Sequence, residues 1–341
     1  MSKKIRIILL MFCGLLHADR FPENGKIFQH VQPFFRWNQI PQAESYVLSI
    51  HDLSNGDELE IPTSSNSFLL IDSMDWGTSY AWFVCGIFED GSTPFCNEIH
   101  EFHINALPDY FPDEITLLNH DETLSQAGIT IMDFESLNFS GALDENGYPV
   151  WYVDKDNFAE RFVFTQFLSN GNLVGFGPGK GYEIDLDGNI IFETPNGLSV
   201  HHQITKTSKD TYFLISATVE DQYCPEECNE SLPDEIPWQG DVFRELDKEG
   251  NELWSWNTFD HFDLADYNPY YVETYNGWND MDWTHSNSIF FDENSVFVSI
   301  RNLSRITKID YSSKELIWNM GESDYMNETY FQEDHDFSQQ H

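Results

Sequence analysis

Histidines recur at the start of successive strand-like segments of this chain. They are the pair His201 and His202, then His285, and finally His341. An imidazole is uncharged near neutral pH and can act as a nucleophile or as a proton donor and acceptor. Arg301 adds a planar guanidinium, which pairs well with oxyanions. Together these residue types suit the transfer of an anionic group through a histidine.

The chain carries no other familiar catalytic pattern. It has no G-x-S-x-G elbow, no H-E-x-x-H helix and no paired-cysteine frame for zinc. Residues 185–189 have the look of a calcium loop, but no ligands with EF-hand spacing follow, so a hairpin turn is the better interpretation. The sequence therefore predicts neither a metal nor a cofactor.

A repeated hairpin pattern from about residue 114 onward must position the histidines. Each copy has a polar turn and then an aromatic-rich strand, at 144–151, 185–192, 247–254 and 312–318. The aromatic positions are 41, 62 and 64 residues apart, which fits four-stranded blades with uneven insertions. In a β-propeller the innermost strands border a central channel, so equivalent positions of several blades converge. The histidine segments are therefore expected to share one pocket with Arg301.

Four motifs cluster in the last 60 or so residues. D-W-x-H-x-N-S stands at 282–288, S-x-R at 299–301, W-x-x-G at 318–321 and F-S-x-Q-H at 337–341. This series resembles the bacterial PAPS-independent aryl sulfotransferase family. The resemblance covers roughly residues 125–341, is dense from 280 to 321 and is thin before 180. It implies a six-bladed β-propeller, of which residues 114–341 have room for about four blades.

The resemblance also implies a reaction. A sulfuryl group would pass from a phenolic sulfate ester to a phenolic acceptor without a nucleotide donor. His341, in F-S-x-Q-H, would attack sulfur and form a sulfo-histidine, which splits the transfer into two displacements. Because His341 is the final residue of the sequence, the chain is expected to be cut off at its own nucleophile and the propeller to be incomplete.

The other motif residues would bind the substrate. The resemblance assigns catalytic sulfate binding to His285, Arg301 and the histidine pair, in which His202 has the better spacing to the following strand. His285 could also protonate the bridging oxygen as a general acid, and Arg301 could hold the equatorial oxygens. His201 and Asn287 complete the expected substrate-binding set.

The chain departs from the family pattern just after the histidine pair. The family usually has H-H-D, whereas Gln203 follows His202 here. A carboxylate partner fixes the tautomer and the ring orientation of a histidine. The replacement therefore leaves the orientation of His202 open.

Residues 27–105 form a different kind of unit. Short strand-like segments lie at 34–37, 45–50, 68–71, 80–85 and 100–104, separated by turn-rich pieces. This spacing favours a β-sandwich, and the F-x-W, Y-x-L-x-I and Y-x-W-x-V patterns resemble a fibronectin type III domain. With a linker over 106–113, the chain is predicted to be all-β, a sandwich followed by the propeller.

The first 18 residues have the pattern of a secretory signal peptide. Lys3, Lys4 and Arg6 form a basic start, and an apolar run over 7–16 leads to Ala18. The run is shorter than the roughly 20 residues of a bilayer-spanning helix, so no membrane span is expected. The protein is therefore expected to be exported, to the periplasm or the extracellular space.

The net charge excludes whole classes of partner. The formal charge is −41, and without the leader 14 basic residues would face 58 acidic ones, or −44. Nucleic acids and anionic membrane surfaces would be repelled. A sulfate site in such a protein needs a local cationic pocket that works against the overall field. The sequence makes no prediction of the oligomeric state.

Two close cysteine pairs follow the leader. Cys85 and Cys96 flank one predicted hairpin, and Cys224 and Cys228 are separated by three residues. An exported chain with an even number of cysteines favours two disulfides, Cys85–Cys96 and Cys224–Cys228. The Cys-x3-Cys spacing could instead bind zinc, but no second Cys/His pair lies nearby, so a metal is the weaker interpretation.

The sequence thus favours an exported aryl sulfotransferase that takes a small aryl sulfate donor and a phenol acceptor. The main alternative is a non-catalytic extracellular propeller that binds glycans or sulfated ligands. A third possibility is hydrolysis, in which water replaces the phenol.

Overall fold

The computed structural model describes residues 20–71, 74–112, 115–116, 118, 128–225, 233–268, 270–271, 275, 280–292 and 294–321. The predicted leader and His341 lie outside these ranges. The chain divides into two compact units, Met1–Leu107 and Pro108–His341. Both are β-structures, and the helical segments given bounds are short: η1 (Glu135–Leu137), η2 (Lys155–Phe158), α1 (Thr258–His261) and η3 (Leu264–Asp266). Within the described ranges no helix has the length and apolarity to cross a membrane.

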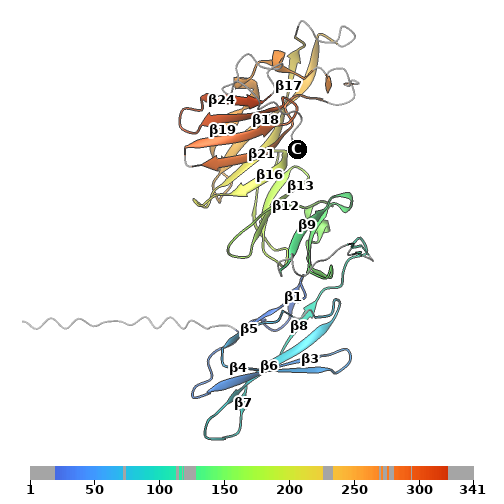
Figure 1. Cartoon of the computed structure of the whole chain (residues 1–341), viewed down its shortest axis with the longest axis vertical. Coiled ribbons are helices and arrows are strands. Elements are labelled where there is room, and N and C mark those ends of the chain that lie inside the picture. The colour runs from blue at the N-terminus through green and yellow to red at the C-terminus, as the bar shows by residue number, and fades with distance from the viewer. Residues whose placement is uncertain are drawn as a thin grey trace, which may run out of the picture. The chain divides into compact units, whose positions relative to one another are not determined.

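The first unit is built on a six-stranded sheet (Figure 1). Its strands in spatial order are β1 (Lys26–Phe28), β8 (His100–Ile104), β6 (Ser79–Ile87), β3 (Ser45–Asp52) and β4 (Glu58–Thr63), with β7 (Phe95–Cys96) paired to β6. A second sheet pairs β2 (Phe34–Arg36) with β5 (Ser67–Leu69). Each of the five segments that the sequence predicted to be strands overlaps one of these strands.

Alternating side chains give this unit its core. Tyr46 and Ile50 of β3 and Trp82 of β6 are buried on one face, as the two-residue period of a strand requires. Phe35 packs edge-on against Trp82 with ring centroids 5.3 Å apart, and Trp37 packs against Tyr46 at 5.6 Å. Edge-to-face aromatic pairs of this kind bury large apolar areas.

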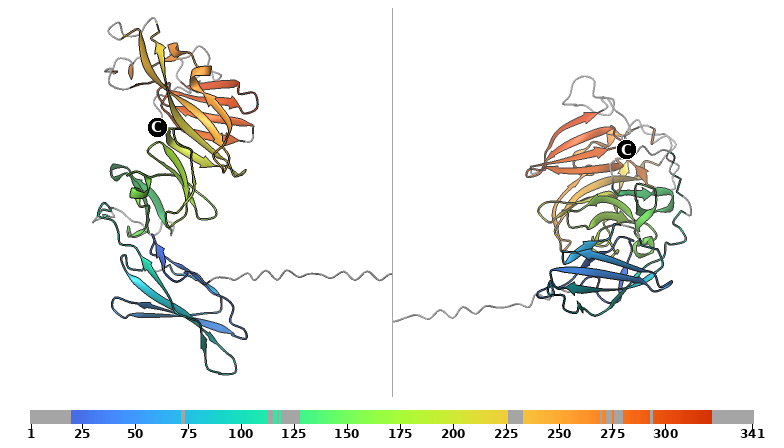
Figure 2. Two further views of the ribbon diagram at one scale, coloured as in Figure 1. Left: turned by 180° about the vertical axis from the view of Figure 1, so that it is seen from behind. Right: turned by 60° about the horizontal axis from the view of Figure 1, so that its bottom comes forward.

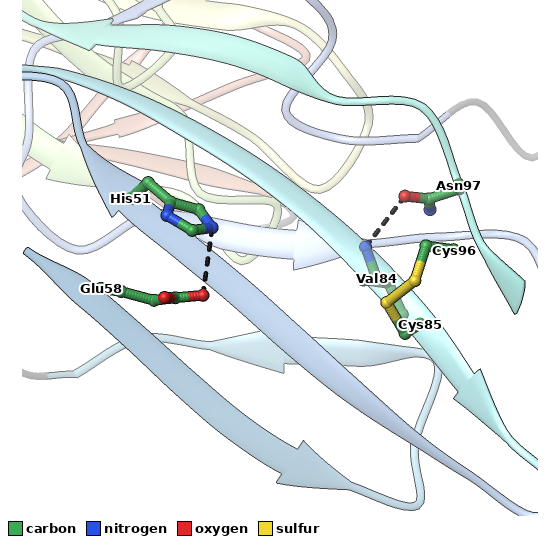
Figure 3. The surroundings of a disulfide bond; sticks show 6 residues. All are labelled: His51, Glu58, Val84, Cys85, Cys96 and Asn97. Atoms are coloured by element: carbon green, nitrogen blue, oxygen red, sulfur yellow. Dashed lines mark hydrogen bonds and ion pairs between the residues drawn. A yellow bond between two sulfur atoms is a disulfide. The ribbon is translucent and has the colours of Figure 1, made fainter. Parts of the chain in front are cut away.

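The predicted disulfide between Cys85 and Cys96 is present and joins β6 to β7 (Figure 3). Beside it, Asn97 accepts a hydrogen bond at 2.8 Å from the backbone N–H of Val84, which continues the pairing of the two segments. The second predicted disulfide involves Cys228, which lies outside the described residues.

The second unit contains four consecutive antiparallel sheets (Figures 1 and 2). The first two are β9 (Thr130–Phe134), β10 (Phe139–Leu143) and β11 (Pro149–Tyr152), then β12 (Val163–Phe167), β13 (Leu173–Gly177), β14 (Lys180–Ile184) and β15 (Ile190–Glu193). The third is β16 (Val200–Lys206), β17 (Tyr212–Tyr223), β18 (Glu235–Leu246) and β19 (Glu252–Asn257), with β20 (Met281–Asp282) parallel to β18. The fourth is β21 (Ser286–Asp292), β22 (Ser295–Ile300), β23 (Arg305–Asp310) and β24 (Leu316–Gly321). Apart from β20, the strands within each of these sheets pair in sequence order, and none of the sheets is closed.

The first strand of each later sheet packs on the sheet before it. Strand β12 contacts β9 and β10, β16 contacts β12, β13 and β14, and β21 contacts β16 and β17. The first strands of successive sheets are therefore neighbours in space. This arrangement brings together the segments that carry the histidines.

The repeated motif forms the turn between the last two strands of each sheet. In the second sheet Asp185 Oδ1 accepts the backbone N–H groups of Asp187 and Asn189 at 3.0 and 2.9 Å. Gly188 has φ +79° in this turn, a conformation that glycine adopts without strain. The same aspartate contacts recur at Asp144 and Asp247. Residues 185–189 are therefore a hairpin turn, as the sequence indicated.

A buried glutamate ties the second sheet to the third. Glu183 of β14 is 1% exposed and accepts hydrogen bonds from Tyr212 at 2.5 Å and from Lys206 at 2.7 Å, both in the third sheet. Asn172 adds a bond at 2.6 Å. Burial opposes ionisation of Glu183, but these donors outweigh it and hold its pKa below the ordinary value.

Glu245 makes the equivalent link from the third sheet to the fourth. It is 2% exposed and accepts hydrogen bonds from Thr211 and from Tyr311, each at 2.6 Å. Burial and this carboxylate raise the pKa of Tyr311 to about 12. Glu183 and Glu245 both stand two residues before the turn aspartate. The same position of the repeat therefore connects one sheet to the next in both places.

Part of the segment that the sequence assigned to a linker packs into the second unit. Phe111 is 4% exposed, and its ring lies 5.4 Å from those of Phe134 and Phe139. This segment packs instead of forming a free linker, because burying the Phe111 ring against β9 and β10 removes a large apolar area from water.

Candidate functional site

The histidine pair lies where β16 is irregular. His201 and His202 fall in a bulge, because the register between β16 and β17 shifts between Val200 and Ile204. His202 has φ +54°, a left-handed conformation that is uncommon for residues other than glycine. Bulges and strained backbone are frequent at functional sites, where they redirect side chains.

His285 lies at the start of the next sheet and shows the same features. It directly precedes β21 and has φ +47°. The register between β21 and β22 shifts between Ser286 and Ser288, which places Asn287 in a bulge. Nδ1 of His285 lies 2.5 Å from Oδ2 of Asp282, so the carboxylate accepts from the ring and fixes its orientation.

The three histidines come together although they are distant in sequence. Their ring centroids are 5.0 Å apart for His201 and His202 and 4.8 Å apart for His202 and His285. All three line a cavity of about 400 Å³ with Ser199 and Gln239. The packing of β16 against β21 produces this meeting.

Asp241, on β18, anchors the pair from behind. Its carboxylate is 0% exposed and accepts from His201 Nε2 at 2.9 Å, from the Thr284 hydroxyl at 2.6 Å and from the Ser286 N–H at 2.7 Å. Its own N–H donates to the Thr258 hydroxyl at 3.0 Å. Burial opposes ionisation of Asp241, but the bonds from His201, Ser286 and Thr284 outweigh it and keep its pKa below the ordinary value.

Arg301 is joined to His285 through the backbone. Its N–H donates to the His285 carbonyl at 3.3 Å, and its Nη1 donates to Asn302 Oδ1 at 3.2 Å. Asn302 is 0% exposed and donates to the Asp282 carbonyl at 2.7 Å. The end of β22 is therefore held beside the segment that carries His285.

Three buried polar atoms around His285 have no hydrogen-bond partner among the described residues. They are Asp282 Oδ1, Ser286 Oγ and Arg301 Nε. Buried polar atoms are nearly always satisfied, since an unmade hydrogen bond costs about 1–3 kcal/mol. Their concentration in one place is typical of a site that is completed by a ligand.

Tyr271 is a candidate that the sequence gave no reason to select. Burial raises the pKa of Tyr271, Arg301 lowers it and Asp282 raises it. The phenol is therefore close enough to both charges to feel them. Tyr271 belongs to none of the motifs, and only the fold brings it to this site.

A second cavity, of about 260 Å³, also includes His202 in its lining. Phe139 and Phe176 form buried parts of it, and the Arg161 guanidinium lies 5.7 Å from the Phe176 ring. Asp133 and Glu135 add carboxylates. His202 thus borders both an imidazole-rich cavity and an aromatic one.

A further cavity, of about 910 Å³, lies in the first unit and includes Phe88 and Phe95 but none of the predicted site residues. We give it no catalytic role, because size alone brings no nucleophile or acid–base group together. Among the described residues no group of three or more His, Cys, Asp or Glu side chains is arranged to hold a metal ion. The predicted nucleophile, His341, lies outside the described residues.

Most of the second unit matches a known protein family. Residues 103–337 match the arylsulfotransferase (ASST) family. This chain belongs to the arylsulfotransferase family. The matched region contains His201, His202, His285 and Arg301, and membership supports aryl sulfotransferase activity with aryl sulfate and phenol substrates at the level of the family.

Comparisons with individual proteins are less informative. No curated protein matches this chain significantly. A protein of unknown function from Bacteroides caccae is 8% identical, with 81% of this chain and 93% of that chain covered and a TM-score of 0.30. AztD of Citrobacter koseri is 11% identical, with 81% and 94% covered and a TM-score of 0.20. We base no argument on likenesses this weak.

Proposed function

We propose that this arylsulfotransferase moves a sulfuryl group from a phenolic sulfate ester to a phenolic acceptor through a sulfo-histidine at His341. The single observation that supports it most is the convergence of His201, His202 and His285 on one cavity, in the region that matches the family. The backbone N–H of Arg301 is bonded to the carbonyl of His285. An unpartnered buried guanidinium nitrogen on Arg301 suits a sulfate oxygen as its acceptor.

In the proposed reaction the imidazole of His341 attacks sulfur, the N–S bond forms and the S–O bond to the phenol breaks. His285 gives a proton to the departing phenolate oxygen, and Asp282, 2.5 Å from Nδ1 of His285, steadies the ring as it does so. Arg301 and His202 hold the sulfate oxygens as charge develops on them. The acceptor phenol then gives its proton to His285 and attacks sulfur. The new S–O bond forms, and the N–S bond breaks to release His341.

The aromatic cavity beside His202 is suited to the aryl group. Phe139 and Phe176 offer apolar ring surface against which a phenol can pack. A ring there would lie next to His202, which borders both cavities.

The remaining expectations from the sequence belong to the same proposal. We infer that the four sheets of the second unit are blades of a β-propeller, that the first unit is a fibronectin type III-like domain and that the protein is exported. The order of the sheets and the contacts between their first strands support the blades. The Cys85–Cys96 disulfide supports an oxidising compartment.

The test is transfer from 4-nitrophenyl sulfate to phenol. The proposal predicts 4-nitrophenolate release that requires phenol, together with formation of phenyl sulfate. Release that does not depend on phenol would make the protein a hydrolase. Binding of aryl sulfates without any release would favour the non-catalytic binding protein instead.

A further inference from the structure

We propose that Asp241 is a positioning residue that directs the protons of the His201–His202 pair, so that His202 presents an N–H group to bound sulfate. The inference rests on the proposed function only in taking the histidine cavity as the sulfate site. It further states that the positive charge that binds sulfate comes from a protonated His201, and that Asp241 controls this protonation.

The hydrogen bonds of Asp241 establish its protonation state. Its Oδ2 accepts hydrogen bonds from the Thr284 hydroxyl and from the Ser286 N–H, at 2.6 and 2.7 Å, so the buried carboxylate is an acceptor. Its Oδ1 lies 2.9 Å from Nε2 of His201. An ionised carboxylate has no proton to give, so Nε2 of His201 must carry the hydrogen.

This assignment limits what the two rings can do. Nδ1 of His201 lies 2.8 Å from Nδ1 of His202, a contact that requires one proton between the two nitrogens. In a neutral pair that proton belongs to His202, because His201 already carries its hydrogen on Nε2. Nε2 of His202 then carries no hydrogen, and its lone pair would repel a sulfate oxygen.

Adding one proton reverses the polarity of the pair. His201 becomes an imidazolium that donates to Asp241 on one side and to His202 Nδ1 on the other. His202, still neutral, then carries its hydrogen on Nε2 and becomes a donor. Sulfate binding is therefore coupled to uptake of a proton, and Asp241 balances the new charge.

The surrounding charges explain why the site needs such a device. His285 and Asp282 face the pair from the segment before β21, and Asp241 faces it from β18. At the second cavity Asp133, Glu135 and Arg161 stand near His202. Carboxylates outnumber fixed cations here, and the whole chain carries −41. An imidazolium formed on binding supplies charge only when the anion is present.

Gln203 fits the same explanation. It stands where the family usually has an aspartate, and its Oε1 accepts the N–H of Ile289 at 2.8 Å, so it connects β16 to β21. The carboxylate that orients the histidine pair is supplied by Asp241 of β18 instead. The departure from the family pattern therefore leaves the pair with an acidic partner.

Inorganic sulfate is the probe, because it occupies an anion site without reacting. Titration calorimetry at pH 7 in buffers of different ionisation enthalpy measures proton uptake on binding. For the wild type we expect a fractional uptake and an affinity about tenfold weaker at pH 8 than at pH 6.

The decisive variant is His201→Gln, whose amide can still donate to Asp241 but cannot take up a proton. It should lose most of the uptake and bind sulfate equally at both pH values. Asp241→Asn should behave similarly if it folds, which circular dichroism would establish. His285→Gln tests whether the neighbouring imidazole takes the proton instead. His103→Gln, on β8 of the first unit, is the matched control and should keep the uptake.

The outcomes separate this inference from the proposed function. Wild-type uptake and pH dependence retained in His201→Gln would overturn the inference, as would uptake lost only in His285→Gln. Wild-type transfer of sulfate without proton uptake would overturn the inference and leave the proposed function standing. Proton-coupled sulfate binding without transfer would do the opposite.

Discussion

The hairpin turns and the first strands of the second unit obey different rules. At Asp144, Asp185 and Asp247 one carboxylate oxygen accepts the same two backbone N–H groups each time. At His202 and His285 the backbone is left-handed and the strands are bulged. Polar atoms are left without partners beside His285, within the part of the chain that the structure describes.

This difference separates the regions that stabilise the fold from the region that is suited to catalysis. The turns, with Glu183 and Glu245 nearby, satisfy their hydrogen bonds and repeat from sheet to sheet. The histidine segments break local rules at the start of two consecutive sheets. Real proteins break such rules mainly at functional sites, where the rest of the structure supports the strain.

The largest expected effect is on the rate of sulfate transfer, and it arises from a change at Arg301. Arg301→Ala should slow sulfate transfer about 10²–10³-fold, the usual loss for one donor to a developing oxyanion. Arg301→Lys should recover only part of this loss, because an ammonium lacks the planar fork. Steady-state rates with 4-nitrophenyl sulfate and phenol measure both.

Arg36, exposed on β2 of the first unit, provides the matched control. Arg36→Ala should transfer at the wild-type rate, since no described contact connects it to the histidine cavity. Equal losses in the two variants would mean that net charge, and not the position of Arg301, determines activity.

A smaller effect, on stability, is expected at the regular region. Glu183→Ala leaves Lys206 and Tyr212 without their buried acceptor, and we expect the free energy of unfolding to fall by about 2–4 kcal/mol. The rate of the folded fraction should be unchanged. Urea unfolding measures the loss, and Glu249→Ala, at an exposed turn position, should change stability by less than about 0.5 kcal/mol. A normal Glu183→Ala stability would refute the connecting role of Glu183.

The smallest expected effect is on the pH dependence of stability, through the ionisation of Glu183. The pKa of Glu183 lies below its ordinary value of 4.5, so its ionised form stabilises the fold above that pH. The contribution is lost as the pH falls through the lowered value. The stability gap between wild type and Glu183→Gln should therefore be constant from about pH 6 upward and shrink below about pH 4.5. The gap is the right measure, because protonating many other carboxylates also relieves repulsion. A gap that widens in acid would contradict the assignment.

The sequence predicted the elements that follow local rules. Turn residues and aromatic alternation located the hairpins, and close cysteines located the Cys85–Cys96 bridge. The motifs selected His202, His285 and Arg301, because family motifs mark chemistry and not only packing. Residue spacing also predicted that the histidines lie close together, since it follows the repeat.

The network behind the histidines could not be predicted in the same way. Asp241 sits in the middle of a strand, with no motif to separate it from the other acidic residues of the chain. Its role arises only when β18 lies beside β16 and the segment before β21. Glu183 and Glu245 left a weak signal, since each stands two residues before a turn aspartate. The burial of Phe111 could not be predicted either, because it depends on the position of β9 and β10 in the folded protein.

The most direct test of the proposed transfer is the mass of the peptide that contains His341. After incubation with 4-nitrophenyl sulfate alone and rapid digestion at neutral pH, that peptide should be about 80 Da heavier, the mass of one sulfuryl group on a covalent intermediate. The increment should disappear when phenol is added and should be absent from His341→Ala. An unmodified peptide in protein that still transfers sulfate to phenol would contradict the sulfo-histidine at His341.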